Sequence, residues 1–432
     1  MNVLVLGGGG REHALAWRLA RDRAVSRVFC APGNAGIAQA ADLVLLDPCH
    51  PDLVRQFVRD RDIALTVVGP ELPLTHGVVD ALLADGRLAF GPTRDAAEIE
   101  SSKVFAKAFM ERHRVPTAAC ALCESADEAR RVVASGRFPF PLVVKADGLA
   151  AGKGVVIAAD QATALAAIEA MMVDRQFGAA GERVLIEEHL RGPEVSVFVV
   201  ADGTRTVAFG TAQDHKRARD RDEGPNTGGM GAFSPSPLVD AALADRITRE
   251  IIQPTIAGLR GEGREFRGFL YAGLLLTADG PKVLEFNARL GDPEAQVVLP
   301  RLDEDLFPLL RDAAAGSLHR DACRFTPDAA VGVVLASGGY PDRYETGKPI
   351  AGLDAVTDEP SGSARTLVFH SGTALCDGEV VTSGGRVLTV VGQADDFQSA
   401  MTAAYRGVSR ISFQGVQYRT DIGAKAVAGR RP

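Results

Sequence analysis

An apolar strand that runs into four glycines and then into a helical pattern constrains the fold most strongly. Residues 1–6 are mostly apolar, residues 7–10 are all glycine, and apolar side chains recur with helical spacing over residues 11–20. Such continuous apolar strands are typical of parallel sheets covered on both faces. More strands are expected at 27–30, 42–45 and 63–68, with a helix at 51–59. Strands that alternate with helices predict an α/β chain that begins with an open, doubly wound sheet.

Length, charge and cysteine content exclude several classes of protein. A chain of 432 residues corresponds to roughly three domains at about 150 residues each, or to two domains with a large insertion. The net charge of −7 leaves no basic field for nucleic acid or an anionic membrane surface. We find no apolar run of the roughly 18 residues that a membrane span needs, so we expect a cytoplasmic protein. Cys120 and Cys123 form a C-x-x-C pair, for which two ordinary half-buried cysteines are favoured over a redox or zinc site.

The first glycine loop is tested against dinucleotide binding. A Gly-x-Gly-x-x-Gly motif that starts at Gly7 would need its third glycine where Glu12 stands. The second strand ends in Cys30 and Ala31, where an acidic residue would hold a ribose hydroxyl. A dinucleotide oxidoreductase is therefore disfavoured. A glycine turn with Arg11 at a helix N-terminus suits a small phosphorylated ligand, and a tight turn without ligand remains the alternative.

The second glycine loop, residues 147–154, joins two predicted strands, 142–145 and 155–158. It is not a Walker A motif, because its glycine spacing is one residue short and no Ser or Thr follows Lys153. A glycine-rich strand connection can close as a lid over triphosphate oxygens with its backbone N–H groups. Lys145 lies on the strand before the loop, where a buried ammonium group needs an anionic partner.

Polar groups at two further strands suggest nucleotide and metal sites. An apolar strand over 184–190 runs into Gly192 and Pro193, a hinge with backbone groups free for an adenine edge. Glu285, Asn287 and Arg289 alternate along another strand and so share one face. A carboxylate and an amide oxygen suit Mg²⁺, and the guanidinium group could neutralise a transferring phosphoryl group. An ordinary polar outer face of a sheet is the alternative.

The order of these features resembles the ATP-grasp superfamily and, within it, the glycinamide ribonucleotide synthetase family. The motifs that carry the resemblance span the chain; they lie at 7–15, 32–34, 69–71, 101–103, 144–154, 212–217, 224–231, 285–287, 291–294 and 418–423. The runs Gln-Asp-His-Lys-Arg at 213–217 and Gly-Pro-Asn-Thr-Gly-Gly-Met-Gly at 224–231 are the most specific of them. One departure is Pro193, which stands beside the nucleotide hinge where the family usually has a glutamate.

The resemblance implies both an architecture and a reaction. The fold class would be α/β, with an N-terminal doubly wound domain, an α+β ATP-grasp centre with an inserted lid, and a small, mostly β C-terminal domain. The implied boundaries are 1–100 for the phosphosugar domain, 101–325 for the ATP-grasp domain with its lid at about 120–190, and 326–432 for the C-terminal domain. The reaction would join glycine to 5-phosphoribosylamine with ATP and Mg²⁺ or Mn²⁺, through glycyl phosphate, in purine biosynthesis. We expect no nucleic-acid or membrane partner, and a monomer.

The resemblance also assigns site residues by role. The catalytic residues would be Arg289, Lys145, Lys153 and Asp292. The ATP-binding residues would be Lys103, Lys145, Gly152, Lys153, Gly154, Glu187, Leu190 and Glu194. The substrate-binding residues would be Gly8, Gly9, Gly10, Arg11, Asn34, Asp214, Lys216, Asn226, Thr227, Gly228, Gly229, Met230, Gly291 and Asp292. The metal ligands would be Glu285 and Asn287.

Two other functions fit parts of the pattern. One is an ATP-grasp ligase that acts on a different carboxylate, and the other is a nucleotide sensor without catalysis. The strand at 274–276 is Leu-Leu-Leu and lacks the extra metal carboxylate that many ATP-grasp carboxylases place there, which argues against a carboxylase. A sensor is disfavoured because the charged groups that phosphoryl transfer needs are all present.

Overall fold

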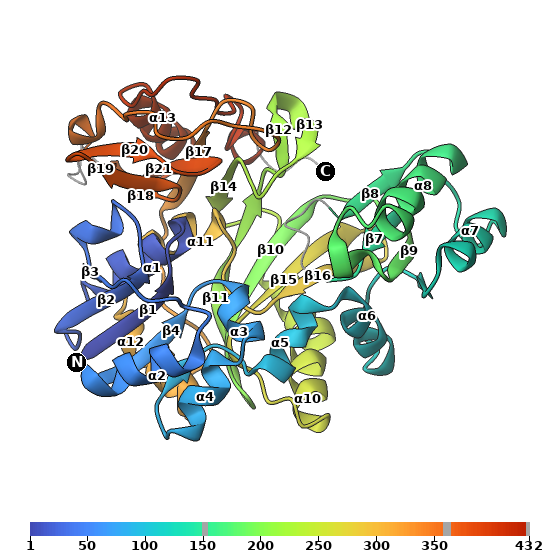
Figure 1. The fold of residues 1–432 in the computed structure, drawn as a ribbon, viewed down its shortest axis with the longest axis horizontal. Coiled ribbons are helices and arrows are strands. Elements are labelled where there is room, and N and C mark those ends of the chain that lie inside the picture. The colour runs from blue at the N-terminus through green and yellow to red at the C-terminus, as the bar shows by residue number, and fades with distance from the viewer. Residues whose placement is uncertain (149–153, 357–363, 429–432) are drawn as a thin grey trace.

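The computed structural model describes residues 1–148, 154–356 and 364–428, and it begins with a five-stranded parallel sheet (Figure 1). The strand order is β3-β2-β1-β4-β5. The strands are β1 (Asn2–Gly7), β2 (Arg27–Pro32), β3 (Asp42–Leu43), β4 (Ile63–Val68) and β5 (Ala89–Phe90), and the helices among them are α1 (Gly10–Leu19), α2 (Pro51–Asp60), α3 (Glu71–Thr75) and α4 (Val78–Ala84).

Both faces of this sheet are buried, as its continuous apolar strands predict. Val3 and Val5 of β1 pack in one cluster with Leu15 of α1. Leu4 and Leu6, which point the other way, pack in a second cluster with side chains of α2 and α4. The prediction of a doubly wound sheet is confirmed.

A second, eight-stranded sheet forms the centre of the molecule and continues into the C-terminal part. Its order is β16-β15-β10-β11-β14-β17-β21-β18. The strands are β10 (Glu194–Asp202), β11 (Thr206–Asp214), β14 (Gly231–Ser234), β15 (Arg267–Thr277), β16 (Gly280–Asn287), β17 (Ala329–Ala336), β18 (Arg365–His370) and β21 (Arg386–Ala394). The short strand β14 joins the two parts, because Phe233 pairs with Gln213 on one side and Val331 on the other.

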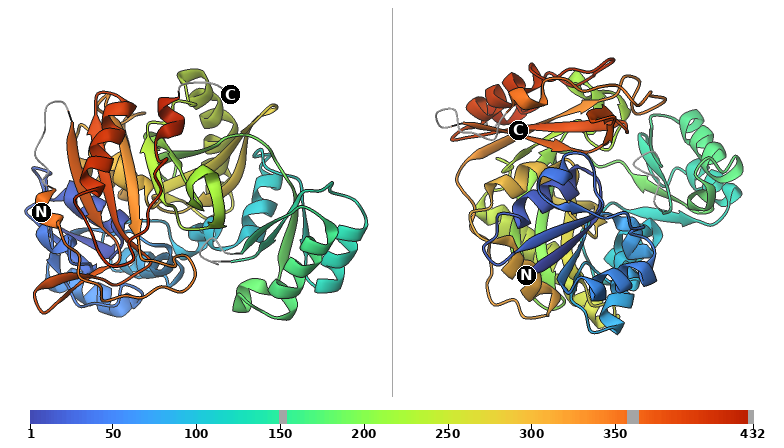
Figure 2. Two further views of the ribbon diagram at one scale, coloured as in Figure 1. Left: turned by 90° about the horizontal axis from the view of Figure 1, so that it is seen from above. Right: turned by 60° about the vertical axis from the view of Figure 1, so that its left-hand side comes forward.

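The predicted lid has its own four-stranded sheet, in the order β6-β9-β7-β8. Its elements are β6 (Cys120–Cys123), α7 (Ala126–Ala134), β7 (Leu142–Ala146), β8 (Val155–Ala158), α8 (Gln161–Ile168) and β9 (Val184–Glu188). The lid also has a separate hydrophobic cluster that includes Phe138, Val144 and Ile186. It projects from the rest of the molecule in both views of Figure 2.

The remaining elements differ from the sequence prediction in three places. The helical pattern over residues 94–113 predicts one helix, but the structure has two, α5 (Arg94–Ser101) and α6 (Lys103–Arg112), because Ser102 has extended backbone and caps α6. The pattern over about 238–260 also predicts one helix, and the structure has α9 (Ala241–Ile247), a π-helical turn at 248–252 and α10 (Gln253–Gly261). The glycine and polar residues of 214–231 predict a long ordered loop, and this segment contains the hairpin β12 (Arg217–Arg219) and β13 (Glu223–Asn226).

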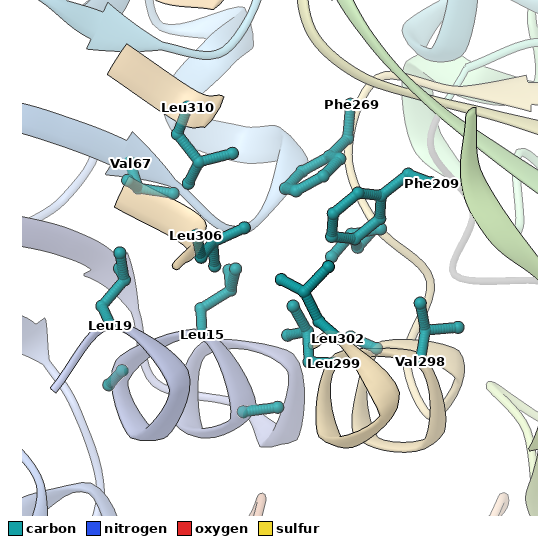
Figure 3. Packing of buried hydrophobic residues seen from close by; sticks show 14 of the residues in the cluster. Leu15, Leu19, Val67, Phe209, Phe269, Val298, Leu299, Leu302, Leu306 and Leu310 are labelled. Atoms are coloured by element: carbon teal, nitrogen blue, oxygen red, sulfur yellow. The ribbon is translucent and has the colours of Figure 1, made fainter. Parts of the chain in front are cut away.

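The largest core joins the N-terminal sheet to the central sheet (Figure 3). It takes in α11 (Glu294–Val298) and α12 (Leu306–Ala314), and Phe90 meets Phe269 edge-on with ring centroids 4.8 Å apart. The C-terminal part adds the hairpin β19 (Thr373–Cys376) and β20 (Glu379–Thr382), α13 (Phe397–Val408) and α14 (Ala424–Val427). Within the described residues, no helix has the length and apolar character needed to cross a membrane.

Candidate active site

A carboxylate buried between two lysines marks the base of the lid. Glu187 of β9 is 2% exposed, and its Oε2 lies 2.8 Å from Nζ of Lys145 on β7. Its Oε1 lies 3.3 Å from Nζ of Lys107 on α6. The sequence predicts that Lys145 needs an anionic partner, and the structure supplies one. Lys107 has no place in the sequence prediction, because only the fold brings α6 against β9.

A third lysine, Lys103, lies at the start of α6 beside the glycine-rich connection. Its Nζ donates a hydrogen bond of 2.7 Å to the carbonyl oxygen of Gly148. Burial lowers the pKa of Lys103, and Lys145 acts in the same direction while Glu285 opposes both. Gly152 and Lys153, also assigned to this site, lie outside the described residues. Gly154 is described and is buried.

The predicted metal ligands lie on β16, with Glu285 45% exposed and Asn287 half-buried. Enclosure among neighbouring groups acts to raise the pKa of Glu285, but the ammonium groups of Lys216, Lys145 and Lys103 outweigh it and lower that pKa. Among the described residues, no three His, Cys, Asp or Glu side chains gather as a metal-binding group. One carboxylate and one amide fit a cation such as Mg²⁺, which completes its shell with water and phosphate oxygens.

Lys216 lies between β16 and the residues predicted to bind the nucleotide. Its Nζ is 3.8 Å from Oε1 of Glu285 and 3.1 Å from Oε2 of Glu194. Glu194 is 49% exposed and Leu190 is half-buried. Asp214 is near this group, and its pKa is raised to about 7 by burial, against the influence of Lys216.

Arg289 follows β16 and is held by two carboxylates: Glu71, which ends the motif at 69–71, and Glu100, which lies in none of the motifs. Its Nη2 is 2.8 Å from Oε1 of Glu100, and its Nε is 3.3 Å from Oε2 of Glu71. Glu100 also accepts a 2.7 Å hydrogen bond from the backbone N–H of Ala288. The guanidinium group is therefore fixed where β16 ends.

The N-terminal glycine turn forms a second group of candidate residues. The N–H of Gly9 donates to Oε2 of Glu12 at 2.7 Å, and Arg11 pairs with the other oxygen of the same carboxylate at 2.7 Å. Arg11 is 7% exposed and also donates to the carbonyl oxygen of Leu290 at 3.0 Å. Its side chain thus ties the turn to the segment that follows β16.

Asn34 closes the other side of the glycine turn. Its amide donates to the carbonyl oxygens of Gly8 and His370 at 2.9 and 2.8 Å. Its carbonyl oxygen accepts the N–H groups of Gly36 and Ile37. Asn34 therefore shapes the loop through its own side chain.

Asp292 brings the glycine turn together with the C-terminal part. Its Oδ2 accepts the N–H of Arg11 at 3.4 Å, and its Oδ1 lies 3.4 Å from Nη1 of Arg386 on β21. Arg386 also donates to the carbonyl oxygen of Gly228 at 2.6 Å. Burial raises the pKa of Asp292, but Arg386 and Arg11 outweigh it and lower that pKa. The sequence gives no signal for Arg386, which lies on a strand far from every assigned motif.

The loop at 224–231 folds back onto Lys216. Thr227 donates both its N–H and its hydroxyl to the carbonyl oxygen of Lys216, at 2.7 and 2.9 Å, and accepts the N–H of Gly229 at 3.0 Å. The N–H of Met230 donates to the carbonyl oxygen of His215 at 2.8 Å. Asn226 pairs with Arg217 in the hairpin, and Gly291 is buried just before Asp292.

The two groups lie at the two ends of one short segment, because residues Glu285 to Asp292 run from β16 to the glycine turn. At its start lie the lysines at the base of the lid, and at its end lie Arg11 and Arg386. The arrangement can hold a polyphosphate with a cation near β16 and a smaller anion near the N-terminus of α1.

Comparison with known proteins finds relatives over almost the whole chain. The sequence models of the phosphoribosylglycinamide synthetase N domain, ATP-grasp (A) domain and C domain match residues 1–100, 101–295 and 330–425. A phosphoribosylamine–glycine ligase of Ralstonia nicotianae is 50% identical over 99% of this chain and all of its own length. A trifunctional purine biosynthetic protein of Gallus gallus is 48% identical over 99% of this chain and 42% of its own length.

Solved structures are also similar to this chain over almost its whole length. The crystal structure of a phosphoribosylamine–glycine ligase from Thermotoga maritima matches with a TM-score of 0.84 and 33% identity, over 98% of this chain and all of that one. A biotin carboxylase from Campylobacter jejuni shares the fold alone, at 15% identity and a TM-score of 0.75 over 99% of this chain and 95% of its own. The full-length matches and the arrangement of the site lead to one conclusion: the chain belongs to the phosphoribosylglycinamide synthetase family of ATP-grasp ligases.

Proposed function

We propose that this chain joins glycine to 5-phosphoribosylamine at the expense of ATP, giving glycinamide ribonucleotide, ADP and phosphate. The reaction is a step of purine biosynthesis. The observation that carries the proposal is the path from Glu285 to Asp292, which connects a lysine-rich base of the lid to a glycine turn at a helix N-terminus. Family membership over the whole chain supports the same reaction.

The ATP end of the site neutralises phosphate charge. Lys103 and Lys145 are near the glycine-rich connection and β16, and we assign Gly152, Lys153 and Gly154 to the same task. Glu187, Leu190 and Glu194 are assigned to the nucleoside. Glu285 and Asn287 would hold Mg²⁺ or Mn²⁺, and such a cation would supply further positive charge beside the phosphates.

The acceptor end holds the two small substrates. Gly8, Gly9 and Gly10 place bare backbone at the N-terminus of α1, which favours a phosphate. Arg11 and Asn34 fix that turn, and the loop that carries Asn226, Thr227, Gly228, Gly229 and Met230 lies against it through Arg386. Asp214 and Asp292 are assigned to the ammonium group of glycine, with Lys216 and Gly291 beside them.

The chemistry then runs in two displacements. A carboxylate oxygen of glycine attacks the γ-phosphorus of ATP, and the bond to ADP breaks. The amine of phosphoribosylamine attacks the carbonyl carbon of the resulting glycyl phosphate, loses a proton, and expels phosphate. The first displacement brings two anions together, the carboxylate and the γ-phosphate, so positioning and charge neutralisation supply most of the catalysis. Arg289 is assigned to that neutralisation from its fixed position at the end of β16.

The deciding experiment measures ADP release in the presence of Mg²⁺, with glycine alone, with 5-phosphoribosylamine alone and with both. We expect release only when both are present, with glycinamide ribonucleotide formed in equal amount. The competing proposal, a ligase for another carboxylate, predicts turnover with a different amino acid and none with glycine, and that result would overturn ours.

A further inference from the structure

Glu187 is shared between two ammonium groups, and one of them is not needed to balance its charge. Lys107 is 5% exposed and Lys145 is 9% exposed, so all three groups are buried. Each carboxylate oxygen faces one lysine, at 3.3 Å for Lys107 and 2.8 Å for Lys145. Two ammonium groups and one carboxylate give this trio a net charge of one positive unit, which a buried site keeps beside an anion such as Glu285 or a bound phosphate.

The backbone and side chains at the base of the lid hold Lys107 in place. Its Nζ donates to Oγ1 of Thr117 at 2.8 Å and to the carbonyl oxygen of Ala118 at 3.2 Å. Thr117 in turn donates to the carbonyl oxygen of Val283 on β16 at 2.7 Å. Lys107 therefore stays with the central sheet and cannot reach a ligand in place of Lys145.

Lys145, by contrast, lies beside the strand that carries the metal ligands. Its Nζ is 3.4 Å from the carbonyl oxygen of Leu284, the residue before Glu285. Among the described residues, Glu187 and Leu284 account for two of its three N–H groups. Of the two lysines on Glu187, Lys145 is thus the one placed to meet a phosphate.

We propose that Lys107 is a positioning residue for the nucleotide phosphates: it holds one oxygen of Glu187 and so leaves Lys145 with positive charge for the ligand. Without Lys107, Glu187 and Lys145 form a closed neutral pair, and phosphate oxygens near Lys145 lose most of their attraction. The inference rests on the proposed use of ATP.

The test compares ADP with adenosine, because only ADP carries phosphates. In calorimetric titrations of the full chain with Mg²⁺, we expect Lys107→Gln to weaken ADP binding about tenfold and to change adenosine binding less than twofold. Lys107→Arg keeps the charge and should recover most of the ADP affinity. Lys282→Gln is the matched control, since Lys282 faces the neighbouring Glu188 at 3.8 Å and is 23% exposed; it should leave both affinities unchanged.

A double variant tests the charge balance itself. Lys107→Gln with Glu187→Gln leaves Lys145 as the single charge, so the net charge returns to one positive unit and the ratio of ADP to adenosine affinity should return toward wild type. A purely structural role for Lys107 predicts that the single variant weakens both ligands equally and that the double variant does not recover; either result would overturn the proposal. If Lys107→Gln alone does not fold, the double variant decides through the same ratio. Failure of the proposed function is seen separately, as absent glycine-dependent ADP release by the unaltered chain.

Discussion

His13 of α1 and His370 of β18 meet in the interior, where the N-terminal sheet contacts the C-terminal strands. The backbone N–H of His370 donates to Nδ1 of His13 at 2.8 Å, and the centroids of the two rings are 5.6 Å apart. Burial, with a contribution from His370, lowers the pKa of His13 to about 3. Burial lowers the pKa of His370 to about 4. Both imidazoles are therefore neutral in the folded protein at ordinary pH.

Because both imidazoles stay neutral in the folded protein, we expect this pair to lower the free energy of unfolding in mild acid. Above the unfolded pKa of 6.5 neither state binds protons, so the pair adds no pH dependence. As pH falls below 6.5, the unfolded chain takes up protons that the folded protein excludes, and the free energy of unfolding decreases until the folded pKa values are reached. Urea unfolding between pH 7.5 and 5 measures the total slope, to which Asp214 contributes in the opposite direction because its pKa is raised to about 7. The share of the histidine pair is the part that a His13 variant removes. His13→Gln should reduce it, whereas the same change at His319, which is 71% exposed, should not; equal slopes in all three would refute the assignment.

Replacing Glu285 should lower metal-dependent turnover without lowering the stability of the fold. Its side chain is 45% exposed, so Glu285→Ala removes no buried contact. We expect the melting temperature to stay within a few degrees and turnover to fall at least about 100-fold, because the proposed cation ligand is lost. Asp279→Ala, an exposed carboxylate on the same β-hairpin, is the control. Unchanged turnover of Glu285→Ala across Mg²⁺ concentrations would contradict the role.

For single residues, the sequence predicts which kind of partner a side chain needs better than it predicts which residue that partner is. The need of Lys145 for an anion follows from its place on a buried strand. That the anion is Glu187, and that Lys107 shares it, depends on how β7, β9 and α6 pack. Glu100 and Arg386 were missed for the same reason, since each meets its partner across a long stretch of chain.

Asp147, at the end of β7, joins the lid to the N-terminus of α6. It accepts the hydroxyl of Ser102 at 3.1 Å and the N–H of Val104 at 3.2 Å. Arg183 pairs with its other oxygen at 2.6 Å. The carboxylate thus satisfies a free N–H group of the first turn and places negative charge there, both of which stabilise a helix.

Replacing Asp147 by Ala should loosen the attachment of the lid. We expect a loss of about 1–2 kcal/mol in the free energy of unfolding, the range found when a side chain that accepts an N–H group in the first turn of a helix is removed. Faster amide exchange should appear over β7 and the first turn of α6. Asp160→Ala is the matched control, because Asp160 caps α8 within the lid through Thr163 at 2.8 Å. Similar exchange at α6 in both variants would contradict the linking role of Asp147.

Among the elements, strands with clear apolar patterns were predicted well and turns less so. The strand expected at 63–68 and the one at 155–158 have the observed bounds. The break at Ser102 was missed because helical spacing continues through it, whereas the cap depends on Asp147 from the lid. The hairpin of β12 and β13 was missed because its residues are polar and it packs on the C-terminal segment through Arg419 and Asp222, 2.9 Å apart.

Across the whole molecule, β14 makes the central and C-terminal strands one sheet. All four of its residues are buried, and it pairs with β11 and β17. A Cβ atom on Gly231 would lie 2.6 Å from the carbonyl oxygen of Gly332 and 2.8 Å from Cδ1 of Ile422. The strand is therefore as close to its neighbours as glycine permits.

Gly231→Ala should destabilise the central strands and the C-terminal strands together. We expect a loss of about 1–3 kcal/mol, typical of overpacking in a core, and a single calorimetric transition for the eight-stranded sheet at a lower temperature. Gly261→Ala is the control, since a Cβ atom there meets nothing within 4 Å. Two separate transitions in the Gly231 variant would indicate that the central and C-terminal strands unfold independently.

The three-part organisation and the ATP-grasp class could be predicted from the sequence, because each motif is a short run of neighbouring residues and the chain length suggests the number of domains. The domain boundaries at 100 and 325 stay predictions. The shared sheet could not be foreseen, because β14 has four residues and its two partners are β11 and β17, strands on either side of it in the chain.

The position of β14 also limits how the protein can be divided for expression. A cut near residue 325 leaves β14 on the first fragment and β17 on the second, each with a row of unpaired N–H and C=O groups along a buried, apolar edge. Such edges attract other chains and promote aggregation. The two fragments should therefore be insoluble when produced separately and should complement each other when produced in the same cell, which makes this chain a natural candidate for a split-protein pair.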